Sequence, residues 1–211
     1  SIAIGNVDAG GTVIADATAG TATFGTINST GRTQVTAAGT LTVDEIRTAT
    51  AGVSIDLYAS GATSDIVAGT LITNNGVIFA SAGRDISLDT AGTPGFSNAF
   101  GNIGLLAGGN VTVTGLLDAG QDVAVRALGN VTLAAVRAGD DVTVQADGTI
   151  TVGSVTAEGN GIDLTSIVFV TPNVGQAGSI LTFLQQPNAT GSNIELTGGV
   201  DVNVTGTLDA Q

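Results

Sequence analysis

A repeat of about twenty residues constrains the fold of this chain more than any other feature of its sequence. Three successive units align, and they read GNVTVTGLLDAGQDVAVRAL from Gly109, GNVTLAAVRAGDDVTVQAD from Gly129 and GTITVGSVTAEGNGIDLTSI from Gly148. A second set of glycines recurs at the same interval, at Gly120, Gly139 and Gly159. A fixed period of this length indicates a solenoid, in which each unit buries its apolar side only against its neighbours.

Within each unit, aliphatic residues separated by one other residue predict short β-strands with one inward face. In the second unit these are Val131 and Leu133, then Val142 and Val144, and a third short strand is expected around Val136. The start of the chain repeats this spacing, at Ile2, Ile4, Val7, Val13 and Ala15. The composition agrees, because 32 glycines and only 3% aromatic residues suit aliphatic strands joined by tight turns.

The inward pairs alternate at unequal intervals, which does not fit the regular six-residue unit of a left-handed β-helix. We therefore predict an all-β fold, a right-handed parallel β-helix with about 19–20 residues per coil and roughly ten coils. It is expected to run through residues 1–211 as one continuous unit. Because neither end resembles a polar cap, the chain is expected to be an excerpt of a longer polypeptide.

The repeat is expected to break at two places, and some of the other coils are less regular. Val77 and Phe79 are interpreted as an inward pair of a less regular coil. Residues 91–101 (AGTPGFSNAFG) are expected to form a loop insertion, and residues 166–193 to form irregular coils. Phe96 and Phe100 make the loop insertion the predicted contact site, because insertions in solenoids are often the binding element. The alternative is that both rings fold back onto the core.

The charge of the chain argues against several partners. Aspartate and glutamate total 18 against 5 basic residues, all of them arginine, for a formal charge of −13. Nucleic-acid binding depends on basic residues that neutralise phosphates, so no nucleic-acid partner is expected. Docking on anionic membranes is disfavoured for the same reason, and no apolar stretch has the ~18 residues of a membrane-spanning helix.

The chain lacks several of the residue types that enzymes commonly use in catalysis. The chain has no His, Cys or Lys, which excludes histidine triads, thiol nucleophiles and Schiff-base lysines. We therefore expect neither enzymatic activity nor a cofactor. Because polysaccharide-processing enzymes also use right-handed β-helices, they are the enzyme alternative. Their candidate residues here would be Asp118, Asp122, Asp140 and Asp141, with Arg126 and Arg137.

Asp122 and Asp141 are weak candidates for a metal site. Each precedes an equivalent strand valine in adjacent coils, so stacking would bring the two carboxylates within roughly 5 Å of each other. Calcium would suit such oxygen ligands, although the glycine-rich calcium repeat is absent. The favoured interpretation is that they are turn aspartates that bond to their own backbone in Asx turns.

Two polar motifs recur along the chain. Asn-x-Thr strings, which match the glycosylation acceptor, occur at Asn28, Asn110, Asn130, Asn188 and Asn203. At Asn110 and Asn130 we favour a ladder of stacked asparagines along the rod axis. Thr-x-Thr pairs raise ice binding as an alternative, but they are not in every coil, so ordinary outward strand threonines are favoured.

The strings G-N-V-T-V, L-x-A-G-x-D-V-x-V and A-x-G-N-V-T-L resemble the haemagglutinin repeats of the filamentous haemagglutinin family, the exoproteins of two-partner secretion systems. Gly109–Ile167 carries the resemblance most strongly, and Ser1–Leu57 and Val200–Ala210 carry it more loosely. The resemblance implies a bacterial cell-surface or extracellular rod, a stalk or adhesin that contacts a receptor or glycan on another cell. The first alternative is a filament of copies that stack through their coil ends, and the second is a polysaccharide-processing enzyme.

Overall fold

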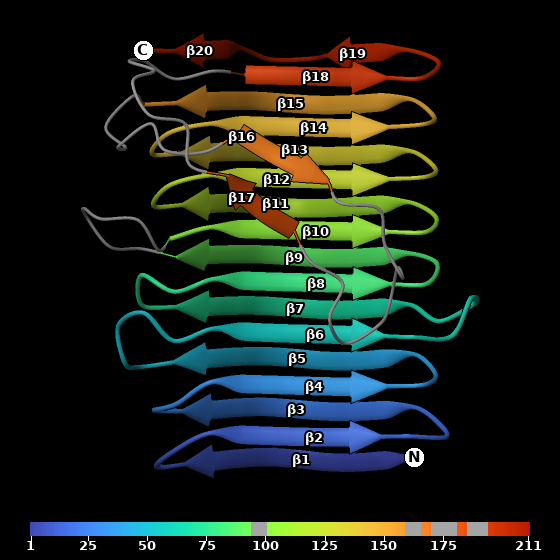
Figure 1. The fold of residues 1–211 in the computed structure, drawn as a ribbon, viewed down its shortest axis with the longest axis vertical. Coiled ribbons are helices and arrows are strands. Elements are labelled where there is room, and N and C mark those ends of the chain that lie inside the picture. The colour runs from blue at the N-terminus through green and yellow to red at the C-terminus, as the bar shows by residue number, and fades with distance from the viewer. Residues whose placement is uncertain (94–100, 159–165, 170–180, 185–193) are drawn as a thin grey trace.

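The computed structural model describes residues 1–93, 101–158, 166–169, 181–184 and 194–211. Every regular element within these ranges is a β-strand, so the predicted all-β class is confirmed. The strands form two large parallel sheets and one small antiparallel pair. Figure 1 shows the strands stacked along one long axis, with the two chain ends at opposite ends of the stack.

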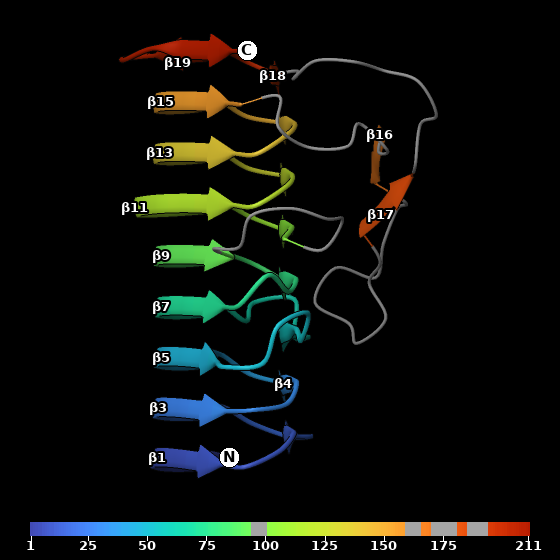
Figure 2. The ribbon, with the colours of Figure 1, turned by 90° about the vertical axis from the view of Figure 1, so that its left-hand side faces the viewer.

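Consecutive strands alternate between the two large sheets, so the chain gains one layer each time it has visited both (Figure 2). The odd-strand sheet contains, in spatial order, β1 (Ile2–Ala9), β3 (Ala22–Ser29), β5 (Leu41–Thr48), β7 (Ile66–Thr73), β9 (Ile86–Thr93), β11 (Val111–Ala119), β13 (Val131–Ala138), β15 (Ile150–Ala157) and β19 (Val202–Val204). β20 (Leu208–Ala210) also pairs with β15. The even-strand sheet contains β2 (Val13–Ala17), β4 (Thr33–Ala37), β6 (Ile55–Ala59), β8 (Ile78–Ala82), β10 (Ile103–Ala107), β12 (Val123–Ala127), β14 (Val142–Ala146) and β18 (Ile194–Gly198).

Each unit of the sequence repeat forms one layer of the stack. Val111 pairs with Val131 and Val131 with Ile150 in the odd-strand sheet, while Val123 pairs with Val142 in the even-strand sheet. Equivalent residues of successive units therefore lie directly above one another, as in a solenoid. Because β19 and β20 both pair with β15, the ten strands of the odd-strand sheet occupy nine layers, close to the roughly ten coils expected.

The third short strand expected around Val136 is not a separate element. Val136 lies in the second half of β13, which is eight residues long. Along this strand Val131 and Leu133 are buried, the next two residues are not, and then Val136 and Ala138 are buried. Two successive outward residues break the period of two, so the strand turns a corner between its halves and each half presents its own inward face.

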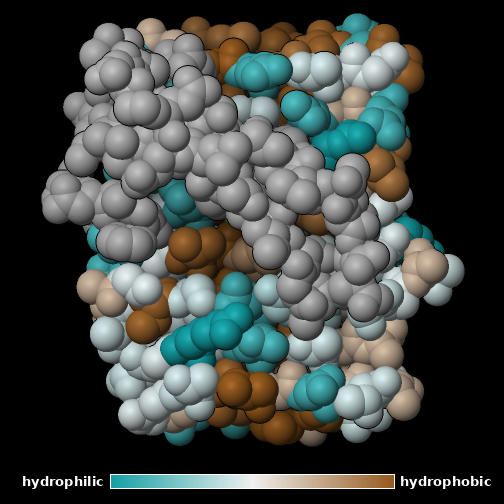
Figure 3. Space-filling model, viewed as in Figure 1, coloured by the Kyte–Doolittle hydropathy of each residue, from teal (hydrophilic) through white to brown (hydrophobic). Residues whose placement is uncertain are grey.

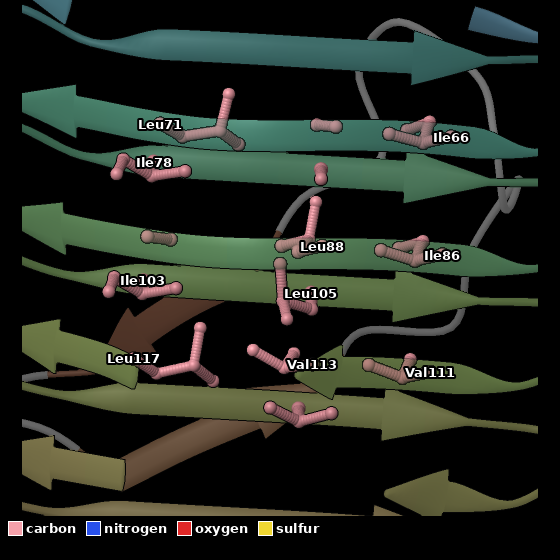
Figure 4. Close-up of a cluster of buried hydrophobic side chains, with 14 of the residues drawn as sticks. Ile66, Leu71, Ile78, Ile86, Leu88, Ile103, Leu105, Val111, Val113 and Leu117 are labelled. Atoms are coloured by element: carbon pink, nitrogen blue, oxygen red, sulfur yellow. The ribbon is translucent and has the colours of Figure 1, made fainter. Parts of the chain in front are cut away.

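The core fills the space between the two large sheets (Figure 4). In the middle layers a small residue lies between two large ones: in the even-strand sheet, Ala80 pairs with Leu57 on one side and Leu105 on the other, and all three are fully buried. In the odd-strand sheet Ala91 lies between Leu71 and Leu117 in the same way. This alternation lets side chains from adjacent layers interdigitate at the density of a protein interior.

Two assignments made from the sequence were wrong. The inward residues of β8 are Ile78 and Ala80, both fully buried in the main core, so the strand faces the opposite way to the expected Val77 and Phe79 pair. Phe79 instead belongs to a separate cluster on the outer side of the even-strand sheet. The first three residues of the expected 91–101 insertion belong to β9, where Ala91 pairs with Leu71 and Leu117.

The described strands within 166–193 are not layers of the stack. β16 (Ser166–Phe169) and β17 (Leu181–Leu184) pair antiparallel with each other in a sheet of their own. The stack continues past this region, because β18 pairs directly with β14 and β19 with β15. We call residues 159–193 the excursion. Within the described part of the chain, no helix is long and apolar enough to cross a membrane.

Candidate functional site

All five arginines are engaged in ion pairs, and four of them join different layers of the stack. The pairs are Arg32–Asp56 at 2.6 Å, Arg84–Asp65, Arg84–Asp85 at 3.4 Å, Arg126–Asp147 at 2.5 Å, Arg137–Glu158 at 2.6 Å, Arg137–Asp118 at 3.7 Å, and Arg47–Glu45 within β5. Each of these cations already faces a carboxylate of the same chain. Four of the arginines therefore act as clamps between neighbouring turns.

The candidate residues of the enzyme alternative have structural partners. The Asp118 carboxylate lies on β11 beside Arg137, and the Arg126 guanidinium donates to Asp147 and to the Ala127 carbonyl oxygen. The exposed fractions of Asp122, Asp140 and Asp141 are only 1%, 1% and 9%. A carboxylate that attacks or protonates a glycosidic bond must reach its substrate, and burial removes these three from such contact.

Asp122 and Asp141 occupy adjacent layers as the sequence predicted. The backbone N–H of Asp141 donates to Asp122 Oδ1 at 3.3 Å, and the N–H of Asp122 donates to Asn102 Oδ1 at 3.1 Å. The acceptor is thus a side chain of the preceding layer, where the sequence suggested a bond within the same turn. Among the described residues, no three His, Cys, Asp or Glu side chains are grouped closely enough to hold a metal ion.

A second ladder confirms the predicted stacking of asparagines. It runs through the turn residues that directly precede β7, β9, β11, β13 and β15. Asn110 Oδ1 accepts from the N–H of Asn130 at 2.8 Å, and Asn130 Oδ1 accepts from the N–H of Thr149 at 2.8 Å. The column extends to Asp85 Oδ1, which accepts from the N–H of Asn110 at 2.7 Å, and to Asp65 Oδ1, which accepts from the N–H of Asp85 at 3.2 Å. Sequence reasoning missed the two aspartates because the repeat is irregular there.

Replacing Asn130 with alanine should lower the free energy of unfolding by about 1 kcal/mol, because the N–H of Thr149 loses its acceptor. Asn130→Asp keeps an acceptor at the same place, as Asp85 does in the same column, and should retain most of the stability. Equilibrium denaturation of both variants checks this expectation. Equal losses in the two variants would show that the ladder contact is not the source of the stability.

Arg84 and Asp65 form a clamp that responds to acid. The hydrogen bond from Arg84 holds the pKa of Asp65 below its usual value, assisted by the backbone N–H of Asp85 and opposed by partial burial. A carboxyl with a lowered folded-state pKa stabilises the fold above its unfolded-state pKa, about 3.9. That contribution is lost as the pH falls through the lower folded-state value.

The stability difference between the natural chain and an Arg84→Gln variant should therefore be constant above about pH 5 and shrink below about pH 4. Denaturation curves at several pH values measure this difference, and carboxyls that titrate alike in both proteins cancel. The difference should also weaken in high salt, because the Arg84 side chain is half exposed. A difference that grows as the pH falls would contradict this account of the clamp.

The remaining polar motifs show no continuous array. Thr23 pairs with Thr42, Thr112 pairs with Thr132 and Thr132 pairs with Thr151. Val67 and Ser87 lie between these two groups in the same column. The turn residue directly before each of these strands is Asp or Asn in the middle layers. The paired threonine surface that ice binding would need is therefore interrupted. Of the remaining acceptor-like asparagines, Asn28 is exposed and donates to Asp8 Oδ1, Asn203 lies in β19, and Asn188 lies outside the described residues.

The proposed contact loop is described only at its base. Phe96 and Phe100 lie outside the described residues. The described residues on either side of them are Thr93 and Gly101. Thr93 Oγ1 donates to the Gly101 carbonyl oxygen at 2.7 Å and accepts from the N–H of Gly120 at 3.0 Å. The buried Thr93 hydroxyl thus joins the two ends of the loop to the next layer.

Sequence reasoning also missed an apolar cluster on the outer face of the even-strand sheet. Tyr58, Phe79 and Leu106, which we call the outer patch, come from β6, β8 and β10. The rings of Tyr58 and Phe79 are 5.8 Å apart and tilted by 55°. Figure 3 views the molecule from this side, where apolar and polar groups both reach the surface around the grey atoms. The sequence signal was the apolar residues at outward positions of strands such as IDLYA and IGLLA.

Comparison of the chain with protein-family models, with curated proteins and with solved structures gave no significant match.

Proposed function

We propose that this chain is a segment of a large bacterial cell-surface or secreted protein, and that it serves there as a structural stalk or adhesin. The observation that carries the proposal is the parallel stacking of nine layers in the odd-strand sheet. Stacked backbone ladders make a stiff rod whose length increases with the number of repeats. A rod of this kind suits holding a contact site away from a cell surface.

The proposal includes the finer architecture of a right-handed parallel β-helix. Connections between neighbouring parallel strands of one sheet are right-handed in about 98% of cases, because a right-twisted strand returns to its sheet most readily that way. Each strand of the even-strand sheet lies within such a connection between two strands of the odd-strand sheet. A crystal structure of the chain tests the hand and the closure of the coil directly.

The chemistry of the surface supports a structural role over a catalytic one. The arginines clamp layers together, and the acidic residues of the enzyme alternative are buried or ion-paired. The acidic surface also favours a soluble rod that does not bind phosphates or anionic lipids. We expect the partner to be a protein receptor or a glycan on another cell, contacted through residues that project from the stack.

The test uses intact cells of the source organism and antibodies raised against the folded chain. Gold-labelled antibody should decorate the outside of unpermeabilised cells in electron micrographs, and a strain lacking the gene serves as the control. Blocking with the same antibody should reduce attachment to host or neighbouring cells. Label that reaches the protein only after permeabilisation overturns the proposal.

Images of the native fibres separate the stalk from the filament alternative. An axial repeat of about 43 Å, nine layers at about 4.8 Å each, would indicate identical copies stacked end to end. Continuous density without that repeat supports one long polypeptide. Release of reducing ends from extracellular polysaccharides by the purified chain would support the enzyme instead.

A further inference from the structure

The turn between β7 and β8 differs from the regular turns of the stack (Figure 1). It comprises residues 74–77 and is one residue longer than the turn from β13 to β14, which comprises residues 139–141. Within it the φ angle of Asn75 is 52°, and no other non-glycine residue among those described has a positive φ. Residues with a side chain rarely adopt this left-handed backbone, and asparagine is one of the few that does so readily. The conformation of the turn therefore favours asparagine at this position.

Gly76, the next residue, is required for a different reason. It is buried, and a Cβ atom here would overlap the carbonyl oxygen of Val53 in the preceding layer and lie 2.5 Å from Thr73 Oγ1. The same Val53 oxygen accepts a hydrogen bond from Thr73 Oγ1 at 2.5 Å, so the contact ties the turn to the layer before it. Backbones this close leave room only for glycine. Two separate requirements of the fold thus place asparagine directly before glycine.

An asparagine followed by glycine can modify itself. The backbone nitrogen of the glycine attacks Cγ of the asparagine side chain, and the new N–Cγ bond closes a succinimide ring. The bond between Cγ and Nδ2 breaks, and the amide nitrogen leaves as ammonia with the proton of the glycine N–H. Water then opens the ring at either of its carbonyl groups and leaves aspartate or isoaspartate. Glycine favours this reaction because no side chain hinders the approach of its nitrogen.

Both reacting groups at Asn75 and Gly76 are free of competing hydrogen bonds. Within the described part of the chain, the N–H of Gly76 donates to no acceptor and the Asn75 side chain has no hydrogen-bond partner. Neither group therefore has to give up a hydrogen bond within the protein before it reacts. Asn75 is also partly exposed, so water can reach the side chain.

The ladders protect comparable positions elsewhere in the stack. Val131 follows Asn130, and its N–H donates to a carbonyl oxygen of the next layer at 3.0 Å. The Asp147 and Gly148 pair could form the same ring, but the N–H of Gly148 donates to the Gly129 carbonyl oxygen at 2.9 Å. Attack at either place first requires a hydrogen bond between layers to break.

We propose that Asn75 is a modification site of this protein, at which the Gly76 nitrogen converts the side-chain amide into a carboxylate in the folded chain. The product adds one negative charge to a chain whose formal charge is −13. Opening of the ring to isoaspartate also lengthens the main chain of the turn by one methylene group. This assignment stands independently of the stalk function, because it concerns only chemistry within the chain.

Tryptic peptides of the chain locate the modification. Trypsin cleaves after Arg47 and Arg84, so residues 48–84 form one peptide that contains Asn75, and residues 127–137 form another in which Asn130 is the single asparagine. The folded natural chain is incubated in mildly alkaline buffer until most of a synthetic peptide of residues 71–80 has reacted. Mass spectrometry with fragmentation should then show the replacement of NH2 by OH at Asn75, whereas the peptide 127–137 should be unchanged.

Asn75→Gly is the matched control. Glycine adopts a positive φ without strain and has no amide, so this variant should fold by circular dichroism and its peptide 48–84 should gain no mass. A second Asn-Gly pair, Asn160 and Gly161, lies outside the described residues and in a different tryptic peptide, so it does not interfere with the measurement.

Modification at Asn75 in the natural chain, absent from the Asn75→Gly variant, supports the proposal. An unmodified peptide 48–84 from the folded chain, at a time when the synthetic peptide has reacted, overturns it. A mass gain that fragmentation places at Asn74, or an equal gain in the Asn75→Gly variant, also overturns it.

Discussion

Replacing Leu105 with alanine should lower the free energy of unfolding by about 3 kcal/mol. Leu105 is fully buried, and its partner in the preceding layer, Ala80, is already small. The substitution would place two alanines above one another between Leu57 and Val125. Because the backbone ladders on both sides hold the layers at a constant spacing, the neighbours cannot close the resulting cavity, and its full cost is expected.

Chemical denaturation followed by circular dichroism measures this loss, and hydrogen exchange shows where the stack opens. Ile14→Ala is the matched control, since it shortens an aliphatic side chain of the same sheet that is 70% exposed, and it should change stability by less than about 0.5 kcal/mol. A loss near 1 kcal/mol for Leu105→Ala would mean that the layers can approach each other, which would contradict a rigid stack.

Gly139→Ala should cost about 2 to 3 kcal/mol although it adds a single methyl group. A Cβ atom at this position would lie 2.2 Å from the carbonyl oxygen of Gly120, the equivalent glycine of the preceding layer. The two turns are tied together by hydrogen bonds from the N–H of Gly139 to the Ala119 oxygen and from the N–H of Asp140 to the Gln121 oxygen. Relief of the contact therefore requires these bonds to stretch or break.

The control for this substitution is Gly10→Ala, at the same turn position in the first layer. A Cβ atom at Gly10 meets no other atom within 4 Å, so this variant should be neutral or slightly stabilising. Denaturation midpoints of the two variants give the comparison. Equal midpoints would show that close stacking of backbones is not the reason for glycine at Gly139.

Most of the stack could be predicted from the sequence because stacking repeats a local pattern. The inward pairs at Val131 and Val142, and the ladder through Asn110 and Asn130, follow from residues that recur at one spacing. The corner within β13 was read as a separate strand at Val136, because a bend and a break leave the same spacing of apolar residues. The reversed face of β8 was missed because Val77 and Phe79 are both apolar and alternate as a core pair would.

The order of the layers, their parallel direction and the core of the regular units are consequences of the sequence alone, because each unit meets a near copy of itself and the period determines which residues are stacked. Contacts that do not follow the repeat were determined only by the tertiary structure. The pairing of β18 with β14 across the excursion depends on contacts between segments that lie far apart in the sequence. No period encodes such contacts, because they arise from shape and apolar area that meet only once the stack has formed.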